Sequence, residues 1–442
     1  MSIKSALASL VAAAVVLAAS PASAVEFKGY LRTGIGGTSE GGNQVCFIPA
    51  PLGYKFRLGN ECENYAELEF GQALYKDKSG VEFKYTGMLH YKTGALRDAE
   101  PIGDNARGNE LAMRQNFVEV TGLPFMGGAS LWAGKRYYHR ADVHILDFYY
   151  WDPSGPGAGV DGIDLGFGKL GVAMFQSKGG WGLGYDVQTK LTFWRPDIRI
   201  YGISVPGGGN LEVGMNAAIK SGGTVGTSAN ADTMGFSQMY TVQHTQPGVL
   251  GGFNKLALQY AVGTIAPGTA YPEPQNSGRA SRWRVVEQLG FQPNEQWSGM
   301  AAFVYEDVTS QYGGPSEGDS FNSFTSWSLG ARPAYHLNDY VKLQLEAGYQ
   351  SFTPKGPGQK EANLTKVTFA PTITPPPGPG GAYYTRPELR VFVSYFNWNE
   401  AMAGTLQTWN AVYYSGPNGG PPAAFGTDKN GFTFGAQLEA WF

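Results

Sequence analysis

The chain has 442 residues with a formal net charge of −3 at pH 7, and only 16% of its residues are charged. This balance argues against a nucleic-acid partner, because surfaces that bind nucleic acids are strongly basic. Glycine (63 residues) and aromatic residues (14%) are abundant, which is typical of a closed β-barrel with tight turns and aromatic girdles.

The N-terminus has the pattern of a secretory signal peptide. Lys4 lies in a short basic start, residues 7–19 are apolar, and Ala22-Ser23-Ala24 is a small-residue cleavage site. Residues 1–24 are therefore expected to be removed. No later apolar run approaches the roughly 20 residues that a transmembrane helix needs. Residues 25–442 are expected to form one unit, because no linker divides them.

Apolar and polar residues alternate from the start of the expected mature chain. A period of two places alternate side chains on opposite faces of a strand, here with one face in lipid and the other in water. The same alternation is seen in residues 27–32, 65–70, 81–92 and 341–348.

The two cysteines, Cys46 and Cys62, lie between the first two predicted strands. Because an exported protein meets an oxidising compartment, we expect a disulfide that stabilises the chain by about 3 kcal/mol in the chain-entropy model. A metal site at these cysteines would need further ligands, and the sequence places none nearby.

The last segment, residues 432–442, alternates over its whole length and ends in Phe442. Its length matches the roughly 9 to 11 residues of a tilted membrane-spanning strand. A terminal strand that ends in phenylalanine also resembles the signal read by the outer-membrane assembly machinery.

Stretches rich in Gly, Pro, Asn and Asp separate the strands and differ in length. We expect short turns at one end of the barrel and long external loops at the other. The Pro-rich run 374–379 is assigned to an exposed loop tip, because proline removes ladder donors. The longest predicted loops are residues 93–109, 152–160, 264–281, 311–322, 371–386 and 414–430.

Several longer motifs match one known family. They include Arg57-Leu58-Gly59-Asn60-Glu61-Cys62 within residues 25–68, the runs 132–144 and 147–159, and Arg386-Pro387 near the end. In these motifs the chain resembles the maltoporin family of sugar porins. The resemblance implies an all-β, antiparallel up-and-down transmembrane barrel of 18 strands, with one loop folded inward as a constriction. The length of the chain would also fit 16 strands.

The resemblance implies a row of lumenal aromatic rings, the greasy slide, on which the apolar face of a sugar ring can stack. The alternative is that these rings belong to the lipid-facing girdle. Strand parity places most of them with charged or amide neighbours, although the parity of Trp398 is mixed. The candidates are Tyr30, Tyr65, Tyr149, Phe253, Trp398 and Trp441.

A polar track opposite the slide would bind sugar hydroxyls, because Arg and carboxylate groups suit vicinal hydroxyl pairs. The alternative is a charge-balanced lining that does not contact sugar. By match to the family motifs, the track residues are Arg32, Arg57, Glu67, Arg114, Arg140, Asp142 and Asp147.

Two features concern selectivity. Tyr149 follows a predicted strand in an aromatic-rich turn, so we expect it at the constriction, where it favours maltose-series sugars over bulkier ones. The family begins its slide with a tryptophan from a neighbouring subunit, but the matching stretch 93–110 has no aromatic residue. Sugar capture at the mouth is therefore expected to differ.

The expected function is passive diffusion of maltose and maltooligosaccharides through a homotrimer in outer-membrane lipid, with a periplasmic sugar-binding protein as a candidate partner. A porin for another sugar, a weakly selective porin and a structural or adhesive barrel are the alternatives. A glycosidase would need a separated acid and base pair, but the carboxylates are interleaved with arginines. No cofactor, metal or enzymatic activity is expected.

Overall fold

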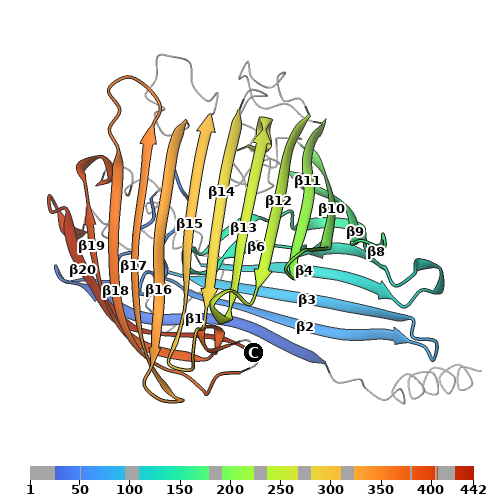
Figure 1. Cartoon of the computed structure of the whole chain (residues 1–442), viewed down its shortest axis with the longest axis horizontal. Helices are drawn as coiled ribbons and strands as arrows, with labels where there is room; N and C mark the ends of the chain where they lie inside the picture. The colour runs from blue at the N-terminus through green and yellow to red at the C-terminus, as the bar shows by residue number, and fades with distance from the viewer. Residues whose placement is uncertain are drawn as a thin grey trace, which may run out of the picture.

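The computed structural model describes residues 25–49, 51–94, 109–178, 192–222, 236–266, 280–309, 323–378, 381–403, 406 and 424–442. Eighteen strands form one antiparallel sheet, in which each strand pairs with its neighbours along the chain. The sheet closes into a barrel because β1 pairs both with β2 and with β20 (Figure 1). This confirms the predicted transmembrane barrel and its 18 strands.

The strands have 7 to 14 residues, as the period-two segments predict. Their bounds are β1 Glu26–Thr38, β2 Asn64–Lys76, β3 Glu82–Thr93, β4 Glu110–Thr121, β5 Ser130–Arg136, β8 Gly155–Asp164, β9 Lys169–Lys178, β10 Thr192–Val205, β11 Gly209–Gly222, β12 Ser237–Pro247, β13 Phe253–Val262, β14 Ser281–Phe291, β15 Trp297–Thr309, β16 Phe324–His336, β17 Val341–Pro354, β18 Ala362–Ile373, β19 Glu388–Trp398 and β20 Asn430–Trp441. Within the described ranges, no helix is both long and apolar enough to cross a membrane.

The connections from β1 to β2 and from β5 to β8 fold into the barrel. The Cys loop, residues 39–63, joins β1 to β2, and the inward segment, residues 137–154, joins β5 to β8. The inward segment contains β6 (Ala141–Val143), η3 (His144–Leu146) and β7 (Phe148–Trp151), and β6 and β7 form a separate two-stranded sheet. The backbone amides of Lys55 and Arg57 donate to Leu146 and Ile145, each over 3.1 Å, so the two connections pair with one another.

These connections fill one side of the lumen with an apolar core. Phe47, Tyr54 and Phe56 of the Cys loop pack with buried residues of the inward segment and with the inner faces of the strands. Glycines in the wall make room for them. A Cβ atom at Gly330 or Gly348 would lie 2.3 or 2.2 Å from the ring of Phe56, which is closer than atoms can pack.

The disulfide between Cys46 and Cys62 is present, with 5.9 Å between the Cα atoms. This confirms the predicted pairing. The bond links the first part of the Cys loop to the residues that lead into β2. Asn60 fixes the loop further, because its side chain accepts a bond from Phe47 N and donates to Phe47 O and Phe56 O, over 2.8 to 3.0 Å.

Two loop predictions are wrong. Residues 152–160 were expected to be a loop, but most of them lie in β8, where glycines pair in the ladder with β5 and β9. The connection after β18 was expected at the loop end of the barrel. Glu388 instead pairs with Glu439 near the chain end, so residues 374–378 and 381–387 lie at the end where β20 terminates, which we call the turn end.

The proline run was misplaced because exposure alone does not say which end of a barrel a segment occupies. Pro376 and Pro377 are exposed, as predicted. The second half of this β18–β19 connection turns inward as η7, Ala382–Tyr384, where Tyr383 is buried. Most of the predicted loops 93–109, 264–281, 311–322 and 414–430 lie outside the described residues.

Candidate functional site

The inner wall has a packed half and an open half. Many inward side chains of β14 to β19 are buried beneath the Cys loop and the inward segment, and Arg284, Arg332 and Glu346 are at most 1% exposed. Several inward side chains of β1, β2 and β4 stay partly exposed, as do residues of the inward segment that lie opposite. Solvent therefore reaches the lumen between the inward segment and the wall formed by β1 to β4.

Three partly exposed aromatic rings line this open half. Tyr30 of β1 is the register partner of Trp441 of β20, and its ring centroid lies 5.9 Å from that of Tyr65 on β2, with the planes 63° apart. All three rings are on the inward face, as their parity predicts. The three adjacent strands β20, β1 and β2 thus each present an aromatic ring to the lumen.

Further aromatic residues lie toward the turn end. The ring centroid of Tyr384, from η7, lies 5.9 Å from that of His144, and the ring centroid of Trp441 also lies 5.9 Å from that of His144. Tyr384 lies before the start of β19, and its side chain is partly exposed. Phe253 is inward and partly exposed at the start of β13, where its ring packs over Gly290.

Tyr149 faces the lumen from the inward segment. It lies in β7 and is 37% exposed. The guanidinium carbon of Arg140 lies 4.5 Å from the centre of the Tyr149 ring and 3.5 Å from that of Tyr137. These are cation–π distances, so Arg140 is held between two rings. Tyr149 is therefore on the exposed surface of the inward segment.

Two arginines on the open side are held by the Cys loop. Arg32 pairs with Glu63 and with Asp147, the latter over 3.4 Å. Arg57 pairs with Glu61 over 2.7 Å and is only 5% exposed. Arg57 also donates to the hydroxyl of Tyr30 over 2.7 Å. Arg57 is therefore placed to orient the Tyr30 ring and exposes little of its own surface.

Glu67 and Arg114 meet at a tyrosine. Tyr65 and Tyr137 both donate to Glu67 Oε1, over 2.7 and 2.6 Å. Arg114 Nε donates to the hydroxyl of Tyr137 over 2.7 Å. Glu67 and Arg114 are each partly exposed, so both keep hydrogen-bonding capacity toward the lumen.

The two aspartates of the inward segment differ in charge environment. Burial raises the pKa of Asp142, and Lys255 and Arg140 offset only part of that shift. Burial acts in the same direction on Asp147, but Arg32 and Arg57 outweigh it and lower its pKa. Asp147 is thus an ionised partner of the arginines. Among the residues the structure describes, no group of three or more His, Cys, Asp or Glu side chains could hold a metal ion.

The arrangement suits a ligand that is apolar on its faces and rich in hydroxyls at its edge. Rings that can stack line the wall, and guanidinium and carboxylate groups lie across from them. Comparison with protein families gives a match to LamB porin over residues 25–442. The chain belongs to the LamB porin family.

This LamB porin is therefore a channel protein of the bacterial outer membrane. Its fold also resembles more distant porins at low identity. One is Salmonella typhi OmpF in complex with daunomycin, with 14% identity, a TM-score of 0.45, and 95% of this chain and 97% of that chain covered. Another is Pseudomonas aeruginosa OccK3 (OpdO), with 10% identity, a TM-score of 0.46 and 95% of each chain covered. Similarities this low carry no argument about solutes.

One slide candidate of this porin requires correction. Trp398 points inward but is only 2% exposed, because its ring packs 5.1 Å from Phe47 and 5.7 Å from Phe425. It belongs to the loop core, so it has no free face for a sugar. The mixed parity of Trp398 did not decide its side of the strand, and alternation could not reveal that the Cys loop covers this part of the wall.

Sequence reasoning missed Tyr384 and Tyr137. Both lie outside regular strands, next to β19 and β5, so alternation does not apply to them. The available signal was local composition. Each belongs to a Tyr-Tyr pair beside an arginine, in Tyr383-Tyr384-Thr385-Arg386 and in Arg136-Tyr137-Tyr138. In each pair one ring is buried and the other is partly exposed.

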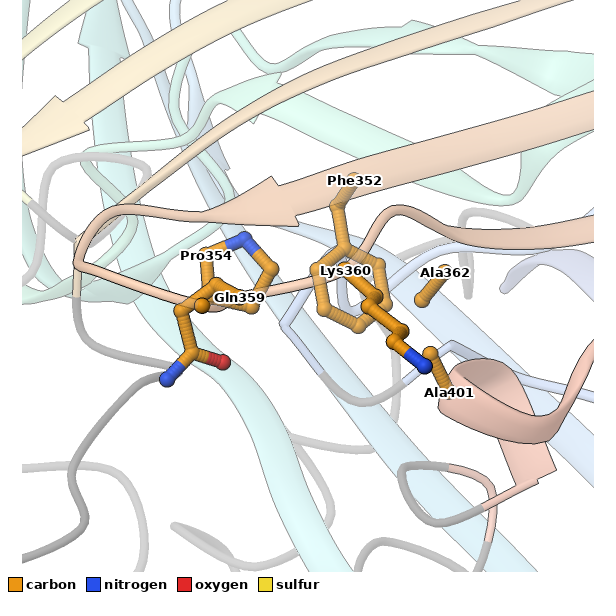
Figure 2. Close-up of a pocket in the computed structure, with 7 residues that line it drawn as sticks. Phe352, Pro354, Gln359, Lys360, Ala362 and Ala401 are labelled. Carbon is orange, nitrogen blue, oxygen red and sulfur yellow. The ribbon is translucent and has the colours of Figure 1, made fainter.

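A pocket of about 250 Å³ lies at the opposite end of the barrel from the turns. Figure 2 shows Phe352 of β17, Lys360 and Ala401 around it. None of its lining residues belongs to the aromatic row or to the polar track. The predicted lack of a vestibule aromatic concerns residues 93–110, most of which lie outside the described part of the chain.

Proposed function

We propose that this porin is a passive, sugar-selective channel for maltose and maltooligosaccharides. The observation that carries the proposal is the partly exposed aromatic surface of Tyr65, Tyr30 and Trp441 on one side of the open half of the lumen. A pyranose has an apolar C–H face, and stacking on each ring contributes on the order of 0.5 to 1.5 kcal/mol beyond area burial, by analogy with aromatic pairs. Weak repeated sites let a solute advance and leave.

We add Tyr384 to the row at its turn end and leave out Trp398, which lies at the opposite end of β19. Tyr384 is partly exposed and shares the neighbour His144 with Trp441. A solute leaving Trp441 would meet this ring next. Phe253, on the inner face of β13, is the remaining proposed platform at that end.

The polar groups opposite the rings support a polyhydroxylated solute. The partly exposed candidates in reach of the lumen are Arg32, Glu67, Arg114, Arg140, Asp142 and Asp147. Guanidinium groups offer several donors in a fixed fork, and carboxylates accept, so together they can bind neighbouring hydroxyls. Tyr149 narrows the space between the two sides, which favours slender linear chains over branched or bulkier sugars.

We also propose that the porin is a homotrimer, exported after removal of residues 1–24. The outward face of β1, β2, β4 and β5 carries the polar residues Thr33, Asn64, Asn116 and Lys135. Such groups fit a contact with another subunit better than a contact with lipid tails, which disfavour charged side chains. A periplasmic sugar-binding protein remains the proposed partner at the turn end.

The test is single-channel recording of the purified porin in planar bilayers with increasing maltotriose. Maltotriose is expected to interrupt the ion current reversibly in a concentration-dependent manner, with sucrose and raffinose as comparison sugars. A current that maltooligosaccharides leave unchanged while another solute blocks it would refute this specificity and leave a porin for a different substrate.

A further inference from the structure

The geometry points to Tyr137 as a positioning residue that holds Arg114 and Glu67 apart at the constriction, so that both remain available to the solute. This inference rests on the proposed sugar channel and deepens it. Tyr137 is the first residue of the inward segment and lies directly after β5. Its backbone amide donates to Gln115 Oε1 over 3.0 Å, which fixes the point where the chain leaves the wall.

The hydroxyl of Tyr137 uses both of its hydrogen-bonding roles. It accepts from Arg114 Nε over 2.7 Å and donates to Glu67 Oε1 over 2.6 Å. One oxygen therefore stands between a cation of β4 and an anion of β2. No ion pair joins Arg114 or Arg140 to a carboxylate among the residues the structure describes, in contrast to Arg32, Arg332 and Arg390.

This arrangement leaves specific groups unused. Arg114 donates its Nε hydrogen to Tyr137, and the two terminal nitrogens of its guanidinium group remain as donors for other partners. Both phenols bind Oε1 of Glu67, so Oε2 remains as an acceptor. A free donor pair on β4 and a free acceptor on β2, brought together by Tyr137, can bind two adjacent hydroxyls of a sugar.

The ring of Tyr137 has a second role. The Arg140 guanidinium stacks on it at 3.5 Å and lies 4.5 Å from Tyr149. Tyr137 thus contacts three residues of the polar track, which come from β2, β4 and the inward segment. It connects the loop that narrows the lumen to the wall that the loop faces.

Loss of the hydroxyl alone should let Arg114 and Glu67 collapse into a direct ion pair, since each would seek a new partner for its charge. A direct pair satisfies both groups and withdraws them from the solute. Tyr137→Phe retains the ring and the Arg140 contact, so it isolates this effect. Tyr138→Phe is the matched control, because it removes a neighbouring hydroxyl that faces Asp161 on β8, away from the track.

The experiment records maltotriose block of the trimer for the parent, Tyr137→Phe and Tyr138→Phe. Tyr137→Phe is expected to weaken the block about tenfold, as for the loss of hydrogen bonds to charged groups. The loss should lie in faster sugar release at unchanged ion conductance, whereas a general distortion of the pore would also change conductance and the association rate. Tyr138→Phe should stay within about twofold of the parent.

A double-mutant cycle with Glu67→Gln separates positioning from a generic loss. Glu67→Gln removes the charge that would pair with Arg114, so no direct ion pair can form. Adding Tyr137→Phe in that background should therefore weaken maltotriose block clearly less than it does in the parent. Equal effects in both backgrounds would overturn the inference. A block that Tyr137→Phe leaves unchanged would overturn it as well.

A crystal structure of the Tyr137→Phe variant tests the same inference without sugar. It is expected to place a nitrogen of the Arg114 guanidinium within ion-pair distance of Glu67. If the two groups stay apart, the inference fails even when sugars block the parent. If the ion pair forms but no maltooligosaccharide blocks the parent, the proposed function fails and the positioning role stands.

Discussion

The packed and open halves of the lumen contain the same kinds of residue but differ in what covers them. In the packed half, Arg332 and Lys366 each lie 2.6 Å from a carboxylate oxygen of Glu346, and all three are at most 2% exposed. In the open half, Arg114 and Arg140 contact tyrosine rings and hydroxyls and stay partly exposed. Inward orientation is therefore necessary for solute contact but does not ensure it.

The desolvation of charged groups explains why the two halves differ in their ion pairs. Buried charges need close partners because desolvation is expensive, and the packed half provides them through ion pairs and bonds to loop carbonyls, as between Lys366 and Leu58 O. Charges in a wet channel keep part of their hydration and can exchange water for sugar hydroxyls. The internal loops thus divide one barrel into a structural side and a transport side.

The largest expected effect is on the packed half. Phe56→Ala removes the ring that packs on Gly330 and Gly348, and we expect it to lower the free energy of unfolding by about 3 to 5 kcal/mol. Urea unfolding of the folded barrel, followed by tryptophan fluorescence, measures this change. Phe125→Ala is the control, since Phe125 is 79% exposed in a turn. Equal losses in both variants would contradict a loop core that stabilises the barrel.

Matched substitutions of two inward tryptophans sharpen the comparison. Trp441→Leu should weaken maltotriose block about fivefold, because an exposed stacking ring is lost. Trp398→Leu should leave the block within about twofold and instead lower stability, because that ring is buried in the loop core. Sugar titration in bilayers distinguishes them. If Trp398→Leu weakened maltotriose block more than Trp441→Leu, Trp398 would have to be counted among the sugar-stacking residues.

The smallest expected effect concerns the boundary between the halves. Tyr149→Ala should raise single-channel ion conductance by about 1.5-fold, since aperture and lining set conduction. The control is Tyr340→Ala, which changes an exposed tyrosine in the turn between β16 and β17. If Tyr149→Ala left the conductance unchanged, Tyr149 would not be a constriction residue.

Alternation was a sound guide wherever a strand separates two solvents. It placed Tyr30, Tyr65, Phe253 and Trp441 on the inner face, as the structure does. Its result for Trp398 was mixed, and it could not show that Phe47 and Phe425 cover this inward ring while Trp441 stays partly exposed. It did not reach Tyr137 or Tyr384, since residues in irregular segments have no period.

The sequence by itself determined the barrel, its closing strands and the disulfide, because these depend on local periodicity and on cysteine number. The tertiary structure alone decided which inward residues meet solvent, which end of the barrel holds the β18–β19 connection, and which tyrosine holds Arg114 and Glu67. These features depend on how loops distant in sequence pack inside the wall. Such long-range packing leaves no repeating pattern in the chain.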